Sequence, residues 1–270
     1  MPLLPAIRPV LDSNAQGGGF ALSAWPILPG ATLQRLLACT CTVLLALLLA
    51  GCSATPRVPD WQLEAHGAQQ RAMRAELEGR ERVAAAEWQR ALEATRRTAR
   101  ADWLARIKLS RCALRQTALD LQACSAAQAL LPHASAAEQA YARYLQAQVQ
   151  PADPDLLPPP HRAVARHLLA APQLQPGQAT ALLRAIDDPL ARLLAASVLL
   201  RAQRLELADL PLAIDTASEQ GWQRPLLAWL LLQQQWAQQA GQSELAAQAR
   251  QRADWLSRPG AAQPPPAPAR

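Results

Sequence analysis

Aromatic residues and glycine are scarce in this chain. Aromatics make up 4% of its 270 residues and glycine occurs 11 times. Beyond Cys52 there is no Phe and no Asn, and Lys108 is the only lysine. Ala, Leu, Gln, Arg and Glu predominate instead, and most of these residues favour helices. Half of the residues are hydrophobic, which is enough for a core in one domain or two small ones. We therefore expect an all-α chain.

Charge of one sign is not concentrated anywhere along the chain. The formal net charge is +6, but many charges stand four residues before one of opposite sign, as Glu76 does before Arg80 and Glu78 before Arg82. Such pairs are typical of solvated helix faces. No basic run is interleaved with aromatic residues, so we expect no nucleic-acid partner.

The motifs of common enzyme classes are also missing. The sequence contains no Gly-Xaa-Ser-Xaa-Gly elbow, no phosphate loop and no dinucleotide fingerprint. None of the four histidines stands at the spacing of a metal site; they are His66, His133, His161 and His167. We expect no catalytic activity, no metal or other free cofactor, and no small-molecule substrate.

The main apolar run, Leu36 to Leu49, is shorter than the roughly 20 residues that a membrane-spanning helix requires. Arg35 precedes this run, and Leu49-Ala50-Gly51-Cys52 ends it. This order resembles the signal peptide and lipobox of bacterial lipoproteins. The resemblance implies cleavage after Gly51 and covalent attachment of a diacylglycerol and an N-acyl chain to Cys52. The alternative is a buried core helix that ends in Gly-Cys.

Lipidation of Cys52 implies a membrane-anchored protein. Ser53 after the lipidated cysteine resembles the sorting signal for the outer membrane, so we expect the periplasmic face of that membrane, with the inner membrane as the alternative. Residues 33–51 are then the signal peptide, and residues 52–59 form a lipidated tether. Residues 1–32 precede the expected signal peptide, and we interpret them as a non-native extension.

Two cysteines remain once the signal peptide and Cys52 are set aside. Cys112 and Cys124 are expected in an oxidising compartment, where disulfides persist. A continuous helix would hold them about 18 Å apart, so a bond requires the helix to end near residues 117–121 and the chain to turn back. We expect this disulfide, and two buried free thiols are the alternative.

Helical periodicity runs through nearly all of the remaining chain. It predicts N-terminal helical hairpins within 60–149, with helices over 60–78, 80–97, 100–119, 125–131 and 135–148. A Pro-rich break follows at 150–160. Beyond it the pattern predicts C-terminal hairpins within 161–258, with helices over 161–171, 175–186, 188–203, 208–220, 223–240 and 242–257. Residues 259–270 are expected to be a disordered Pro-rich tail.

Glycine turns followed by small residues recur near both ends of this helical region. Gly79 is followed by Ala84, Trp88, Ala91 and Leu92, and Gly241 is followed by Ala246 and Ala253. The first spacing resembles the second helix of a tetratricopeptide repeat, whereas Arg250 and Asp254 depart from it in the second. The resemblance implies hairpins stacked as a tetratricopeptide-like α-solenoid. Irregular packing of generic hairpins is the alternative.

Two sets of side chains are candidates for partner binding. One set consists of Trp222, Trp229 and Trp236, which stand seven residues apart and so share one helical stripe. Such a stripe belongs to the core or forms an aromatic-lined groove for a partner peptide or helix. The other set is a basic ridge of Lys108, Arg111 and Arg115. This ridge is a solvated face, or it contacts anionic glycans, lipid headgroups or an acidic partner.

These features together predict a role outside catalysis. We expect a membrane-anchored periplasmic lipoprotein that acts as a protein-interaction or scaffold module and binds other envelope proteins. The alternative is a peptidoglycan- or glycan-associated enzyme, or the regulator of one, that takes part in cell-wall remodelling.

Overall fold

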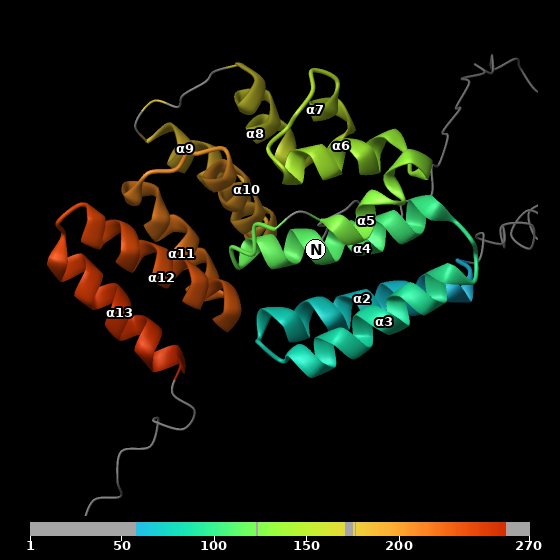
Figure 1. Ribbon diagram of the computed structural model, residues 1–270, viewed down its shortest axis with the longest axis horizontal. Helices are drawn as coiled ribbons and strands as arrows, with labels where there is room; N and C mark the ends of the chain where they lie inside the picture. Colours follow the sequence, from blue (N-terminus) through green and yellow to red (C-terminus); the bar gives the residue numbers. More distant parts are fainter. Residues whose placement is uncertain (1–57, 123, 171–174, 176, 258–270) are drawn as a thin grey trace, which may run out of the picture. The chain divides into compact units, whose positions relative to one another are not determined.

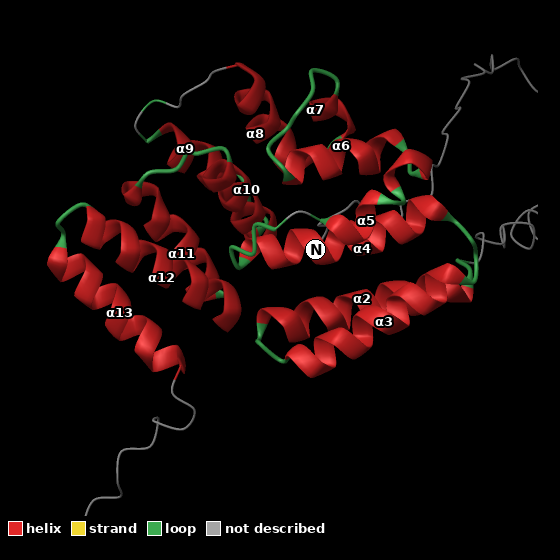
Figure 2. Ribbon diagram, viewed as in Figure 1, coloured by secondary structure: helices red, strands yellow, loops and turns green. Residues whose placement is uncertain are grey.

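The computed structural model describes residues 58–122, 124–170, 175 and 177–257, and the regular secondary structure in these residues is entirely helical (Figures 1 and 2). The all-α prediction is therefore confirmed. The first elements along the chain are α2 (Asp60–Leu77), α3 (Glu81–Arg96), α4 (Ala101–Thr117), α5 (Ser125–Gln128), the 3₁₀ turn η1 (Leu131–His133) and α6 (Ala136–Leu145). They are followed by α7 (Asp153–Leu156), α8 (Pro159–Ala170), α9 (Gln178–Arg184), α10 (Pro189–Arg201), η2 (Leu207–Asp209), α11 (Leu210–Glu219), α12 (Gln223–Gln239) and α13 (Ser243–Ser257).

Two helical hairpins are built on glycines in the left-handed conformation. Gly79, with φ of 77°, turns α2 into α3, and Gly241, with φ of 72°, turns α12 into α13. A left-handed residue ends a helix most easily when it is glycine, because glycine has no Cβ to clash with the backbone. The α2–α3 hairpin closes over small buried residues that let the helix axes approach; they are Ala68, Ala72, Ala75, Ala84 and Ala91.

Helix α10 lies at the centre of the described domain. It contacts α4, α8, α9 and α11, and most of its residues are buried. Its sequence is apolar on every side, which is typical of a helix without a solvent face. Asp188 caps its start by accepting a hydrogen bond from the Ala191 N–H at 2.8 Å, and Pro189 occupies a first-turn position that needs no N–H donor.

Contacts between distant helices distinguish this domain from a simple linear stack. In an α-solenoid each repeat contacts only its neighbours, but here α4 contacts α10 and α2 contacts α12. The Trp229 indole N–H on α12 donates to the Thr117 carbonyl at the end of α4 (2.9 Å). The first and last hairpins are thus held in one compact unit, which begins at Asp60.

The Pro-rich segment 150–160, where we expected a break between the two groups of hairpins, is partly helical. It contains helix α7 and the start of α8. Asp153 is 1% exposed and accepts two hydrogen bonds from the Arg143 guanidinium, at 2.9 and 2.5 Å. Pro154 and Pro159 lie in first turns, where proline starts a helix because no N–H is needed there.

Candidate anion-binding cleft

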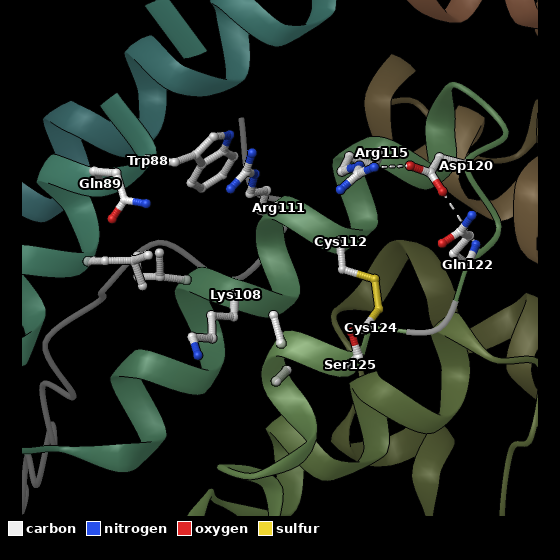
Figure 3. A pocket seen from close by; sticks show the side chains of 14 residues that line it. Trp88, Gln89, Lys108, Arg111, Cys112, Arg115, Asp120, Gln122, Cys124 and Ser125 are labelled. Atoms are coloured by element: carbon white, nitrogen blue, oxygen red, sulfur yellow. Dashed lines mark hydrogen bonds and ion pairs between the residues drawn. A yellow bond between two sulfur atoms is a disulfide. The ribbon is translucent and has the colours of Figure 1, made fainter. Parts of the chain in front are cut away.

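The basic ridge lines a cleft between α3, α4 and the segment that follows α4 (Figure 3). Lys108, Arg111 and Arg115 are three to four residues apart, so they lie on one face of α4. The cleft has a volume of about 350 Å³, which is within the range of small-ligand sites. Asp120, Gln122 and residues 124–127 form its opposite wall, and Gln89 of α3 adds an exposed amide. Spacing in the sequence identified the ridge, but it could not show the cleft.

Apolar side chains form the floor of the cleft. Trp88, Leu92 and Ile107 line it and are buried. The Trp88 indole N–H donates to the buried carboxylate of Glu76 at 2.6 Å. Because this bond joins α3 to α2, it fixes the ring under the cleft. The floor of the cleft is therefore apolar, with its one indole N–H already bonded to Glu76.

A disulfide joins the two walls of the cleft. Cys112 of α4 is bonded to Cys124, with 5.7 Å between their Cα atoms. Helix α4 ends at Thr117, and Leu119 takes a left-handed conformation with φ of 60°, which turns the chain back. A bond between Cys112 and Cys124 requires the helix to end between them, and α4 ends at Thr117. The disulfide thus holds Cys124 against α4.

The two ends of the cleft differ in charge. At one end Arg115 forms an ion pair with Asp120, and the Gln122 N–H lies 3.4 Å from the same carboxylate. Elsewhere along the cleft Lys108 and Arg111 make no ion pair within the described residues, and their head groups point in different directions (Figure 3). The Arg111 Nε–H is buried there and has no hydrogen-bond partner. A buried donor without a partner is unfavourable, so this end favours an anion.

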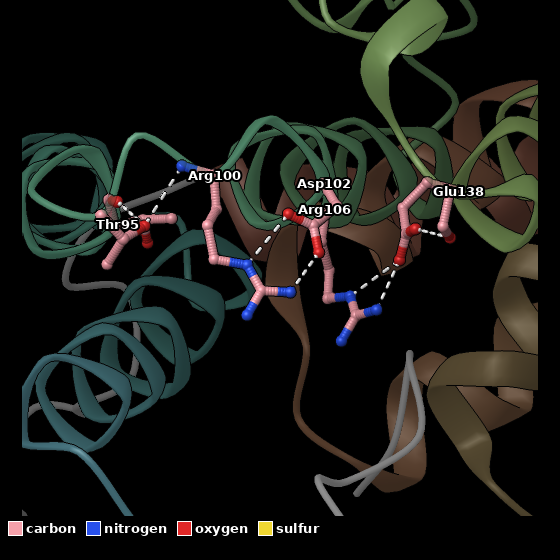
Figure 4. Close-up of polar contacts among 7 residues, drawn as sticks. Thr95, Arg100, Asp102, Arg106 and Glu138 are labelled. Atoms are coloured by element: carbon pink, nitrogen blue, oxygen red, sulfur yellow. Dashed lines mark hydrogen bonds and ion pairs between the residues drawn. The ribbon is translucent and has the colours of Figure 1, made fainter.

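Three arginines near the ridge have carboxylate partners, two of which are drawn in Figure 4. Arg100 binds Asp102 at 2.7 Å and Arg106 binds Glu138 at 2.6 Å. The hydrogen bond from Arg100 lowers the pKa of Asp102 and so keeps this carboxyl ionised. Arg97 likewise pairs with Glu64 at 3.2 Å. The uncompensated positive charge on α4 is therefore concentrated at Lys108 and Arg111.

The tryptophan stripe belongs to the core and does not form an open groove. Trp229 is completely buried, and Trp222 and Trp236 are half-buried against the core. Their seven-residue spacing places all three on one face of α12, and this face packs against the core. Trp255 on α13 is instead 66% exposed. The sequence could have predicted this exposure, because Trp255 falls outside the helical stripe of the buried residues Ala246, Ala249 and Ala253.

Other chemistry-bearing groups do not assemble elsewhere in the described chain. No group of three His, Cys, Asp or Glu side chains in it could hold a metal ion. His161 is buried, its Nδ1 lies 3.2 Å from the Tyr144 hydroxyl, and burial lowers its pKa to about 4. No described helix has the length and hydropathy needed to cross a bilayer. Gly51 and Cys52, the expected cleavage and lipidation site, lie outside the described residues.

Comparisons with known proteins add no name to this geometry. The chain matches no protein-family profile, no curated protein sequence and no solved structure. The fold and the cleft therefore carry the functional argument.

Proposed function

We propose that this protein is a lipid-anchored module of the bacterial cell envelope that binds partners and does not catalyse a reaction. The observation that carries the proposal is the cleft, with free cations at one end and an apolar floor. Its lining side chains offer positive charge and hydrogen-bond donors. Among the described residues that line it there is no histidine, and its carboxylate, Asp120, is paired with Arg115. Such a site suits recognition better than proton transfer.

The anchor in this proposal is Cys52. Its lipobox context supports attachment of two or three acyl chains, and each buried methylene contributes about 0.8 kcal/mol to membrane binding. Ser53 supports the periplasmic face of the outer membrane, with the inner membrane as the second choice. The helical domain begins at Asp60, so a short tether separates it from the membrane surface.

The partners in this proposal are other envelope proteins, for which the domain serves as a scaffold. The hairpins α2–α3 and α12–α13 are its tetratricopeptide-like units. Their left-handed glycines and buried alanines support this comparison, while the α2–α12 contact departs from a regular solenoid.

A second candidate is an enzyme or regulator that associates with peptidoglycan or another glycan. The free cations of Lys108 and Arg111 favour it, because an anionic polymer is attracted to uncompensated positive charge. We rank it second because no catalytic arrangement supports an enzyme.

Mass spectrometry of the mature N-terminus tests the anchor. We expect Cys52 to carry the acyl chains and the Cys52→Ala variant to leave the membrane fraction; an unmodified N-terminus would contradict the proposal.

Affinity capture from detergent-solubilised envelope tests the scaffold role, which requires stoichiometric protein partners that are lost with Arg111→Glu. Sedimentation of the protein with purified peptidoglycan, again lost with Arg111→Glu, would support the second candidate instead.

A further inference from the structure

The Cys112–Cys124 disulfide is open to the cleft. Both cysteines line this cleft of about 350 Å³, and Figure 3 shows the bond between α4 and the start of α5. Cys112 is partly exposed, whereas Cys124 is 8% exposed. Exposed disulfides are the ones that thiols reduce most readily. A small thiol can therefore reach this bond in the folded protein.

The charges around the bond favour attack by a thiolate. Lys108 stands four residues before Cys112 and Arg115 three residues after it, so both lie beside it on one face of α4. Asp120 is the one carboxylate among the described residues that line the cleft, and it is paired with Arg115. Lys108 and Arg111 therefore leave a net positive field, which attracts an incoming thiolate and stabilises the thiolate that leaves. A field acts at a distance, so the two head groups need not converge on one atom.

Two contacts hold the wall of the cleft in place without the disulfide. Asp120 is paired with Arg115 of α4, and the Leu121 carbonyl accepts a hydrogen bond from the Arg201 guanidinium of α10. These contacts tie residues 120 and 121 to two helices. Reduction can therefore release Cys124 from α4 while the helices stay packed.

We propose that the Cys112–Cys124 bond is a reversible redox site, which a dithiol reductant opens within the folded protein with the help of Lys108 and Arg111. A thiolate of the reductant attacks the more exposed sulfur, that of Cys112, and Cys124 leaves as a thiolate. The second thiolate of the reductant then attacks the reductant's own sulfur in this mixed disulfide and releases Cys112. Two electrons pass to the protein, the reductant becomes a disulfide, and its two thiol protons end on Cys112 and Cys124. This inference is independent of the proposed anchor at Cys52.

Reduction of the full chain by dithiothreitol, without denaturant, tests whether the bond opens in the folded state. Trypsin cleaves after Arg111 and Arg115, so alkylation of Cys112 and of Cys124 is read in separate peptides by mass spectrometry. We expect the rate of reduction to rise in proportion to the dithiothreitol concentration.

The Asp153→Ala variant shows whether this reduction depends on unfolding. Asp153 lies outside the cleft, and its loss leaves Arg143 without its partner. If the bond opens in the folded state, the variant should be reduced at the same rate as the wild type. If reduction requires global unfolding, the rate should rise about 30-fold or more, by the same factor as the unfolding equilibrium constant that urea denaturation measures. A rate that follows unfolding in this way would overturn the inference.

Two monothiols of similar size test the role of the cations. 2-Mercaptoethanesulfonate carries a negative charge that 2-mercaptoethanol lacks, and the two are compared by their initial rates of exchange at equal thiolate concentration. We expect the folded protein to favour the sulfonate by roughly threefold to tenfold, relative to the same protein unfolded in urea.

Matched variants assign this preference to the cleft. Lys108→Gln should lower it at least about twofold, whereas Lys108→Arg, which keeps the charge, should retain it. Arg250→Gln, at an exposed position on α13 outside the cleft, should also retain it. No preference in the folded wild type, or one that Lys108→Gln leaves unchanged, would overturn the inference.

Discussion

His161 is a buried titratable residue that lies between two tyrosines. Its ring centroid is 5.0 Å from that of Tyr144 and 6.2 Å from that of Tyr141, and its Nε2 has no hydrogen-bond partner. Burial disfavours the charged imidazolium and lowers the pKa from 6.5 to about 4. The folded protein therefore keeps His161 neutral at pH values where an exposed histidine is protonated.

This burial predicts a loss of stability in mild acid. Below pH 6.5 the unfolded chain gains a proton at His161 that the folded chain does not take up until about pH 4. The free energy of unfolding should therefore fall by about 2 kcal/mol between pH 7.5 and pH 5. Urea unfolding at both pH values measures it. The His161→Phe variant replaces the imidazole with a ring that cannot be protonated and should show a smaller fall; an equal fall in both proteins would refute the assignment.

Asp153 is a buried carboxylate whose partner is Arg143. The hydrogen bonds from Arg143 lower the pKa of Asp153, and the Gln150 N–H also donates to it at 2.8 Å. Asp153→Ala should cost about 2–3 kcal/mol of stability, because Arg143, only 28% exposed, is left without a counter-charge. Chemical denaturation measures the change.

Asp155 provides a matched control two residues along the chain. It pairs with Arg166 at the surface and is 82% exposed. Asp155→Ala should therefore cost less than about 1 kcal/mol. Equal costs for the two variants would contradict a structural role for the Pro-rich segment.

At the scale of single elements, the disulfide links α4 to the start of α5. Cys112 and Cys124 are 12 residues apart, and a loop of this length contributes about 3 kcal/mol in the chain-entropy model. The Cys112→Ala/Cys124→Ala double variant should lose about this much stability in thermal or urea unfolding. A reducing agent should lower the stability of the wild type and leave the double variant unchanged. Sensitivity of the double variant to the reductant would contradict this explanation.

Most helices could be predicted from the sequence because their ends carry local signals. The helix expected over 223–240 is Gln223–Gln239, between Gly221 and Gly241, and the one expected over 80–97 is Glu81–Arg96. Helix α7 escaped prediction, since the five prolines of segment 150–160 suggested a break. Its first residue, Asp153, is paired with the buried side of Arg143 on α6, a contact that no local pattern reveals.

The candidate site could be predicted only in part. The spacing of Lys108, Arg111 and Arg115 is sufficient by itself to place them on one helix face. Whether such a face is solvated or lines a cleft depends on what packs beside it, here Gln89 and the turn that carries Asp120. The tryptophan stripe was ambiguous for a similar reason. A seven-residue spacing is expected both for side chains buried in the core and for side chains that line a partner-binding groove.

At the scale of the whole molecule, Trp229 joins the C-terminal hairpin to the centre of the domain. Its side chain is completely buried, and its indole N–H binds the last turn of α4. Trp229→Ala should cost about 3–5 kcal/mol, because it leaves a large cavity and an unpaired carbonyl. Trp255→Ala is the control, since that ring is 66% exposed, and it should cost less than about 1 kcal/mol.

Native-state hydrogen exchange shows whether the hairpins unfold together. If the domain is one cooperative unit, Trp229→Ala should speed exchange of the most protected amides in α4 and α10 as much as in α12, because all of them open with global unfolding. Trp255→Ala should leave these rates nearly unchanged. Faster exchange confined to α12 and α13 would mean that the C-terminal hairpin unfolds separately, as the end of a linear helical stack does. The α2–α12 and α4–α10 contacts favour the cooperative result.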